Sequence, residues 1–133
     1  MGRTIVRIIG SRPAEELFIR MTLNEVDGLV DEVILVDHDF SHSGEPLEYV
    51  FDGVFPEEWQ LPHGTQFTYR RVSIADAVIR DPNTSEGLHK NESLTRGTFR
   101  GEIDVGSDDI VIAVDADEVI YRSSVHELVR RVR

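Results

Sequence analysis

An unbroken run of apolar residues, Ile110-Val111-Ile112-Ala113-Val114, leads directly into three carboxylates at Asp115, Asp117 and Glu118. Four of its five residues are β-branched, and a continuous run of this kind is typical of a strand that is buried on both faces. Such strands are found at the centre of parallel sheets. The run therefore predicts a strand over residues 109–114 at the centre of a parallel sheet.

The N-terminal part of the chain has the pattern of a strand–helix–strand unit. Thr4–Ile9 is rich in β-forming residues and is closed by Gly10, and Val33–Val36 is a second buried run. Between them, Ser11 is suited to cap a helix whose apolar side chains recur at helical spacing up to Val30. Two strands joined by a helix within about thirty residues indicate a βαβ unit.

The remaining segments predict further elements of both kinds. Residues 66–72 favour a strand, and residues 81–87 have the composition of a loop. A short helix is expected near residues 57–60, a longer one over 91–103, and a last one from Ser124 onward. This order predicts one α/β domain over residues 1–133, a three-layer sandwich with a mostly parallel sheet.

Composition limits the partners and the cellular compartment. The chain has 133 residues, a formal net charge of −11 and no cysteine. The acidic balance argues against nucleic acid as a partner, and the lack of cysteine excludes disulfides and cysteine-ligated zinc. No apolar run approaches the ~20 residues needed for a membrane span. We therefore expect a cytoplasmic protein without a membrane span.

Acidic residues follow two of the predicted strands, at the ends where open α/β sheets bind ligands. Asp37 follows one strand, and Asp115 and Asp117 follow another. In an extended backbone Asp115 and Asp117 share one face, and closely spaced carboxylates of this kind suit Mg²⁺ or Mn²⁺. The alternatives are an acidic turn at Asp115–Glu118 and a simple turn residue at Asp37.

Two further pairs have spacings that invite a functional interpretation. Glu92 and Arg96 lie one helical turn apart, either as a surface ion pair or as an arginine that the glutamate holds toward a phosphate. His38 and His42 flank a loop and form only a weak metal-binding pattern. No glycine-rich phosphate loop follows any predicted strand, which disfavours an ATPase or an NAD-dependent enzyme.

Four ordered blocks of the sequence resemble a glycosyltransferase family. They are Leu23–Asp37, Phe40–Pro46, Asn91–Gly97 and Asp108–Val119. The family is the one named for β-1,4-mannosyl-glycoprotein N-acetylglucosaminyltransferase, which adds bisecting N-acetylglucosamine. Asp115-Ala116-Asp117-Glu118 is similar to the Asp-x-Asp-Glu motif of this family and of other GT-A glycosyltransferases, and Arg20 falls where the family has a helix arginine.

The resemblance implies a GT-A, Rossmann-like domain that binds a nucleotide sugar, with a UDP-sugar as the expected donor. It implies Asp115 and Asp117 as ligands of Mn²⁺ or Mg²⁺, and Asp37, Glu92, Arg96 and Asp115 as donor-binding residues. It also implies inverting transfer of a sugar such as N-acetylglucosamine to an acceptor hydroxyl. The blocks match the nucleotide-sugar half of the family and not its acceptor region, and no residue can be named as the general base.

Two other functions stay open on the sequence. One is a binding module, derived from a truncated glycosyltransferase, that holds a nucleotide sugar or a partner without transferring the sugar. The other is a phosphotransferase of the haloacid-dehalogenase type, which also has Asp-x-Asp after a buried strand. There the motif opens the chain and a Gly-Thr turn follows it, whereas Glu118-Val119 follows it here.

Overall fold

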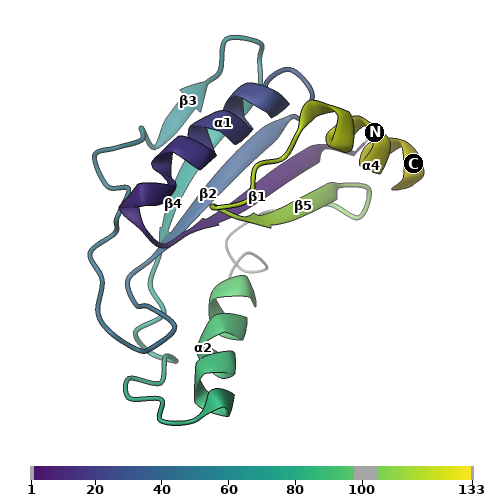
Figure 1. Cartoon of the computed structure of the whole chain (residues 1–133). Coiled ribbons are helices and arrows are strands. Elements are labelled where there is room, and N and C mark those ends of the chain that lie inside the picture. The colour runs from purple at the N-terminus through teal and green to yellow at the C-terminus, as the bar shows by residue number, and fades with distance from the viewer. Residues whose placement is uncertain (1, 98–104, 133) are drawn as a thin grey trace.

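The computed structural model describes residues 2–97 and 105–132 of the chain. This part contains five strands, three α-helices and one short 3-10 helix, arranged as in Figure 1. In chain order the elements are β1 (Thr4–Gly10), η1 (Pro13–Glu15), α1 (Glu16–Val26), β2 (Glu32–His38), β3 (Glu58–Gln60), β4 (Gln66–Val72), α2 (Ser85–Gly97), β5 (Ile110–Asp115) and α4 (Arg122–Val132).

The strands form one mixed sheet in the order β3-β4-β2-β1-β5. β1 pairs in parallel with β2 and β5, and β2 pairs in parallel with β4, whereas β3 is antiparallel to β4. The prediction of an α/β fold with a mostly parallel sheet is confirmed. β1, α1 and β2 form the expected βαβ unit, because the two strands are adjacent and parallel.

β5 lies at an edge of the sheet, so the predicted central position of this strand was wrong. In the described part of the chain it pairs with β1 alone, and its residues are half-buried or exposed. The central strand β1 is instead buried along its whole length. The apolar run was misleading because both faces of β5 do meet apolar groups, Ile112 and Val114 on one face and Val111 on the other. An apolar run thus shows that the two faces of a strand are covered, but it does not show whether the strand has a neighbouring strand along both of its edges.

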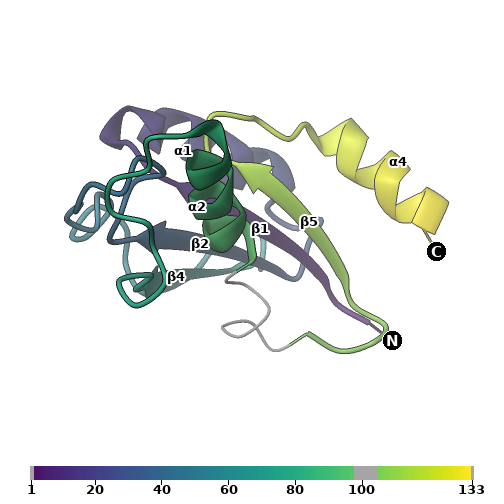
Figure 2. The same ribbon diagram turned by 90° about the horizontal axis from the view of Figure 1, so that it is seen from below.

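Helices α1 and α4 cover the same face of the sheet, as Figure 2 shows. The main core lies between them and the sheet and includes Ile19 and Leu23 of α1 and Val125 of α4. The opposite face carries a smaller apolar cluster around Ile5 and Val36. Among the described residues no helix lies on that face, and α2 lies beyond the carboxyl edge instead. The expected three-layer sandwich is therefore present in part, as a sheet with one helical layer.

Two local predictions were wrong. Residues 58–60 form strand β3 rather than a helix, because Trp59 pairs with Phe67 of β4 and packs against its ring at 6.1 Å. Helix α2 begins at Ser85, inside the predicted loop, where the Thr84 hydroxyl accepts a hydrogen bond from the backbone N–H of Gly87 (3.1 Å). Residues 98–103 of the predicted helix lie outside the described residues.

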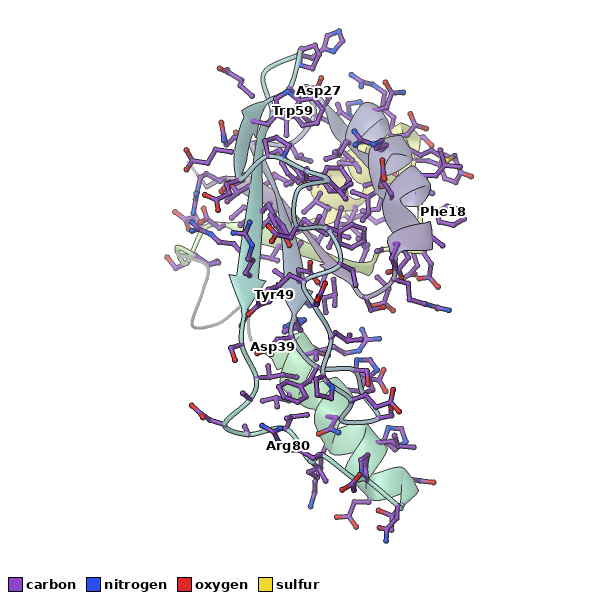
Figure 3. All side chains as sticks on the ribbon, turned by 90° about the vertical axis from the view of Figure 1, so that its left-hand side faces the viewer. Phe18, Asp27, Asp39, Tyr49, Trp59 and Arg80 are labelled. Carbon is purple, nitrogen blue, oxygen red and sulfur yellow. The ribbon has the colours of Figure 1, made fainter. Side chains whose placement is uncertain are left out.

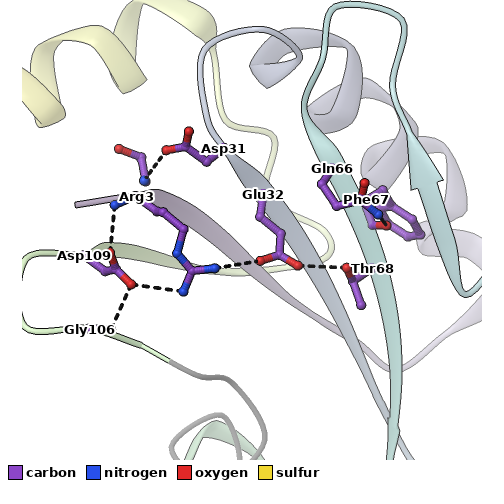
Figure 4. Close-up of polar contacts among 9 residues, drawn as sticks. Arg3, Asp31, Glu32, Gln66, Phe67, Thr68, Gly106 and Asp109 are labelled. Atoms are coloured by element: carbon purple, nitrogen blue, oxygen red, sulfur yellow. Dashed lines mark hydrogen bonds and ion pairs between the residues drawn. The ribbon is translucent and has the colours of Figure 1, made fainter. Parts of the chain in front are cut away.

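A polar network fastens the amino ends of the parallel strands (Figure 4). Arg3 donates its backbone N–H to Asp109 Oδ1 (2.7 Å) and its guanidinium to Asp109 Oδ2 (3.1 Å). The same guanidinium pairs with Glu32 (3.5 Å), which accepts a hydrogen bond from Thr68 (2.8 Å). Since these residues lie at the starts of β1, β5, β2 and β4, the network holds the strands in register. The carboxyl edge, at the other end of the strands, contains the candidate site.

Candidate functional site

A cleft of about 610 Å³ lies at the carboxyl edge of the parallel strands. The ends of β1, β2 and β5 form one side of it, and α2 contributes the other. The lining residues that bear on function are Arg12, His38, His42, Glu92, Thr95, Arg96, Asp115 and Asp117. The volume is within the usual range for ligand sites, and the position is the one at which open α/β sheets bind ligands.

One buried side chain, Asn91, fixes α2 in its place beside the cleft. Its amide nitrogen donates to the backbone carbonyls of His42 (2.8 Å) and Ile79 (2.9 Å), and its oxygen accepts from the backbone N–H of Ile79 (2.8 Å). Asn91 thereby ties α2 to the loop that follows β2 and to the segment that follows β4. Asp39 and Arg80, labelled in Figure 3, lie in these two segments next to α2.

The acidic motif folds as a tight turn at the end of β5. The backbone N–H of Glu118 donates to the carbonyl of Asp115 (3.0 Å), and the backbone N–H of Asp115 donates to the Glu118 carboxylate (3.0 Å). Asp115, Asp117 and Glu118 each offer one carboxylate oxygen, and these atoms lie within 4.8 Å of one another. The turn therefore brings the carboxylates together, whereas the sequence argument relied on an extended backbone through Asp117.

Arg96 links α2 to the acidic motif across the cleft. Its Nη2 lies 3.1 Å from Asp115 Oδ2 and 3.2 Å from Glu92 Oε1. The hydrogen bond with Asp115 is the main reason that the pKa of Arg96 is raised above its ordinary value, so the guanidinium stays charged. Four predicted site residues, Glu92, Arg96, Asp115 and Asp117, are thus brought together at one end of the cleft.

The donor set of the acidic motif fits a hard divalent cation. Its ligand atoms are carboxylate oxygens, which suit Mg²⁺ and Mn²⁺ better than they suit softer metals. Three carboxylates within 4.8 Å repel one another, and Arg96 offsets the charge of only one of them directly. Asp115 and Asp117 could therefore hold the cation that the resemblance implies, with Glu118 as a third oxygen donor.

Asp37 lies away from the other predicted site residues. It is 1 % exposed, and its Oδ2 accepts hydrogen bonds from the Tyr69 hydroxyl (2.7 Å) and the backbone N–H of Phe51 (3.0 Å). Burial raises its pKa, although these hydrogen bonds act in the opposite direction. Asp37 is absent from the lining of the cleft, and its contacts are those of a residue that joins β2 to β4 and to the loop around Phe51.

His38, at the end of β2, and His42, in the loop that follows it, line the cleft but form no metal cluster with its acids in the described residues. His38 is buried, and this burial lowers its pKa to about 4, so its ring is neutral near pH 7. His42 Nε2 lies 3.1 Å from the Thr95 hydroxyl of α2. His38 therefore brings a neutral ring to the cleft, and His42 links the loop after β2 to α2.

Arg12 is a lining residue that the sequence argument overlooked. It lies two residues after the end of β1, so the rule that points to the carboxyl ends of strands applies to it as well. The Glu15 carboxylate holds this turn by accepting the backbone N–H groups of Ser11 (2.8 Å) and Arg12 (2.6 Å). Arg20 lies outside the lining, because it pairs with Glu16 (2.7 Å) on the exposed side of α1.

Comparisons with protein-family models, with curated proteins and with solved structures find no match to this chain. None of the described helices has the length and the apolar character that crossing a bilayer requires. A function must therefore be argued from the chemistry of the cleft, together with the four sequence blocks.

Proposed function

We propose that this chain binds a nucleotide sugar in the cleft with the help of Mn²⁺ or Mg²⁺ and transfers the sugar to an acceptor hydroxyl. The observation that carries the proposal is the meeting of three carboxylates and one arginine at one end of a 610 Å³ cleft. A diphosphate is strongly anionic, and the chain carries a net charge of −11. A cation held by the acids and the guanidinium of Arg96 would together make the cleft suitable for such a ligand.

The side chains at this end of the cleft divide into two roles in the proposal. Asp115 and Asp117 would hold the cation, which when bound stabilises the negative charge of the diphosphate leaving group. Arg96 would donate hydrogen bonds to the phosphate oxygens. Glu92, one turn earlier on α2, positions Arg96 by accepting from its Nε (3.2 Å).

The resemblance supports the same assignment from the sequence. Its third block, Asn91–Gly97, covers the part of α2 that carries Glu92 and Arg96, and its fourth block includes the turn with Asp115 and Asp117. Two separate blocks of the resemblance thus contribute residues to one place in the fold. A GT-A fold, a UDP-sugar donor and inverting transfer of a sugar such as N-acetylglucosamine are parts of the proposal.

A titration of the purified chain with UDP-N-acetylglucosamine, with and without Mn²⁺, tests the proposal by calorimetry. We expect binding that depends on Mn²⁺ and that Asp117→Asn weakens at least about tenfold, since it removes one ligand charge without a change of shape. Asp76→Asn is the matched control, because Asp76 is exposed and outside the lining of the cleft. Metal-dependent binding that survives Asp117→Asn unchanged would show that the site is wrongly assigned.

A donor-hydrolysis assay on the same samples separates transfer from binding. Release of UDP that requires Mn²⁺ and is lost in Asp117→Asn supports the transferase. Metal-dependent binding without release of UDP, or of transferred sugar in the presence of glycan acceptors, favours the binding module instead. A phosphatase activity that Asp115→Asn abolishes would point to the haloacid-dehalogenase type of chemistry.

A further inference from the structure

We propose that Arg96 is a switch that makes the affinity for the cation depend on the nucleotide. Without ligand, the Arg96 guanidinium occupies Asp115, and a bound diphosphate draws it away and leaves Asp115 to the cation. This inference rests on the proposed function, because it assumes a cation and a diphosphate in the same cleft. It adds a coupling between the two ligands that the proposed function does not require.

The two ion pairs of Arg96 differ in what they connect. The contact with Glu92 (3.2 Å) joins two side chains one helical turn apart on α2, so it does not bridge the cleft. The contact with Asp115 (3.1 Å) crosses the cleft from α2 to the end of β5. The Arg96 side chain is 49 % exposed, so it has room to exchange the second partner while it keeps the first.

The three carboxylates of the acidic motif differ in whether a positive charge neutralises them. Among the described residues, neither Asp117 nor Glu118 forms an ion pair, whereas Asp115 pairs with Arg96. A cation that approaches Asp115 therefore meets a positive charge already in contact with one of its ligand oxygens. The two positive charges repel each other, so Arg96 lowers the affinity of the acidic motif for a cation when no nucleotide is bound.

A second arginine makes the Arg96 position easier to leave. Arg7 of β1 is buried, and it faces the same side of the sheet as Asp115. The register shows this, because Ile9 is level with Asp115 and Arg7, two residues before Ile9, points to the same face as Ile9. The pKa of Arg7 is lowered by burial and by the nearby charge of Arg96, while the nearby charge of Asp115 acts in the opposite direction. Two guanidinium groups thus lie near one carboxylate, and a diphosphate that accepts hydrogen bonds from Arg96 relieves this crowding.

These contacts have a thermodynamic consequence. If the nucleotide removes Arg96 from Asp115, it raises the affinity for the cation, and the cation must raise the affinity for the nucleotide by the same factor. A cation can also contact the diphosphate directly, which couples the ligands in any variant. The contribution of the switch is therefore seen most clearly in the affinity for the cation alone.

Titration of Mn²⁺ into the full chain, alone and with saturating UDP, tests this inference in the wild type, Arg96→Gln and Lys90→Gln. Lys90 is the matched control, since it is on the same helix and pairs with Glu86 outside the cleft lining. We expect Arg96→Gln to bind Mn²⁺ alone roughly fivefold more tightly than the wild type, the upper range for a half-exposed ion pair. The factor by which UDP raises Mn²⁺ affinity should fall in Arg96→Gln and stay unchanged in Lys90→Gln.

The possible failures are distinguishable. Thermal unfolding of each variant first establishes that it is folded. If Arg96→Gln and Lys90→Gln bind Mn²⁺ alone with the same affinity as the wild type, while Asp117→Asn abolishes binding, the switch is overturned and the cation site stands. If the wild type and Arg96→Gln both fail to bind Mn²⁺ in the presence or absence of UDP, the switch and the proposed function are both overturned.

Discussion

Replacement of Asp37 with alanine separates a structural role from a ligand-binding role at the end of β2. The sequence placed Asp37 among the donor-binding residues, whereas the structure buries its carboxylate beneath Tyr69 and Phe51. Alanine leaves two buried donors, the Tyr69 hydroxyl and the Phe51 backbone N–H, without their acceptor. We therefore expect the substitution to act on folding and to leave ligand affinity nearly unchanged.

The magnitude follows from these two hydrogen bonds. A buried donor that loses its partner costs about 1–3 kcal/mol, so two of them cost about 2–6 kcal/mol. Removal of the carboxylate itself offsets part of this cost, because burial disfavours its charged form and raises its pKa. We expect Asp37→Ala to lower the free energy of unfolding by about 2–4 kcal/mol. Tyr69→Phe, which removes one charge-assisted hydrogen bond, should lower it by about 1.5–3 kcal/mol.

Urea denaturation followed by the fluorescence of Trp59, the one tryptophan of the chain, gives these free energies. In Asp37→Ala/Tyr69→Phe no orphaned hydroxyl remains, so the double variant should be about 1–2 kcal/mol more stable than the sum of the single effects predicts. Tyr121→Phe is the control, because Tyr121 is 59 % exposed, and its effect should stay below about 0.5 kcal/mol. If Asp37→Ala loses less than about 0.5 kcal/mol and loses UDP-sugar binding, the donor-binding hypothesis for Asp37 is right and the argument from burial fails.

Three further predictions concern pH and packing. The pKa of His38 is lowered from 6.5 to about 4, chiefly by burial, so the unfolded chain takes up this proton first and stability falls as the pH drops through that range. At 1.36 kcal/mol per pKa unit, the loss in the free energy of unfolding approaches about 3 kcal/mol. Urea unfolding at pH 7 and pH 4.5 should show this loss in the wild type and a much smaller loss in His38→Gln. Hydrogen bonds from the backbone of Arg3 and Gly106 hold the pKa of Asp109 at about 2, below its ordinary value of 3.8. The Asp109 carboxylate therefore contributes fully to the stability of the fold above pH 3.8, and this contribution is lost as the pH falls from 3.8 to about 2. An NMR titration of the Asp109 carboxyl carbon should find this midpoint, and a midpoint near 4 would contradict the network in Figure 4. Gly10→Ala would drive a methyl group into the Phe51 ring, and urea unfolding should show a loss of about 1–3 kcal/mol.

Most of the fold could be predicted from local patterns, because the central strands and α1 are also the most regular in sequence. The runs at Thr4–Ile9 and Val33–Val36 lie in β1 and β2, where both faces are buried. β3 could not be found in the same way, since its three residues become a strand only through pairing with β4. The start of α2 depended on Thr84, a capping signal that the loop-like composition around it concealed.

The candidate site was predictable where chain order alone brings residues to the carboxyl edge. Asp115 and Asp117 follow a parallel strand, and Glu92 and Arg96 share one face of α2, so their meeting needs only that α2 lies beside that edge. What places α2 there is Asn91, which acts through three hydrogen bonds to backbone atoms. A contact of a side chain with the main chain of a distant loop leaves no periodic pattern in the sequence.

Asp37 and Asp115 lie on opposite faces of the sheet, and this difference depends on the register between the strands, which the sequence alone does not reveal. Ile9 of β1 is level with Asp115 on one side and with Val36 on the other, so Asp115 shares a face with Val36 and not with Asp37. His38 follows on the same face as Asp115 and lines the cleft, while Asp37 points into the core below α1. A shift of β2 by one residue would exchange the two, but it would also turn Val33 and Leu35 out of the main core. The packing of α1 on β2 therefore decides which acid at the end of a strand faces the cleft. An acid is a site candidate only when its side chain lies on the face of the sheet that borders the cleft.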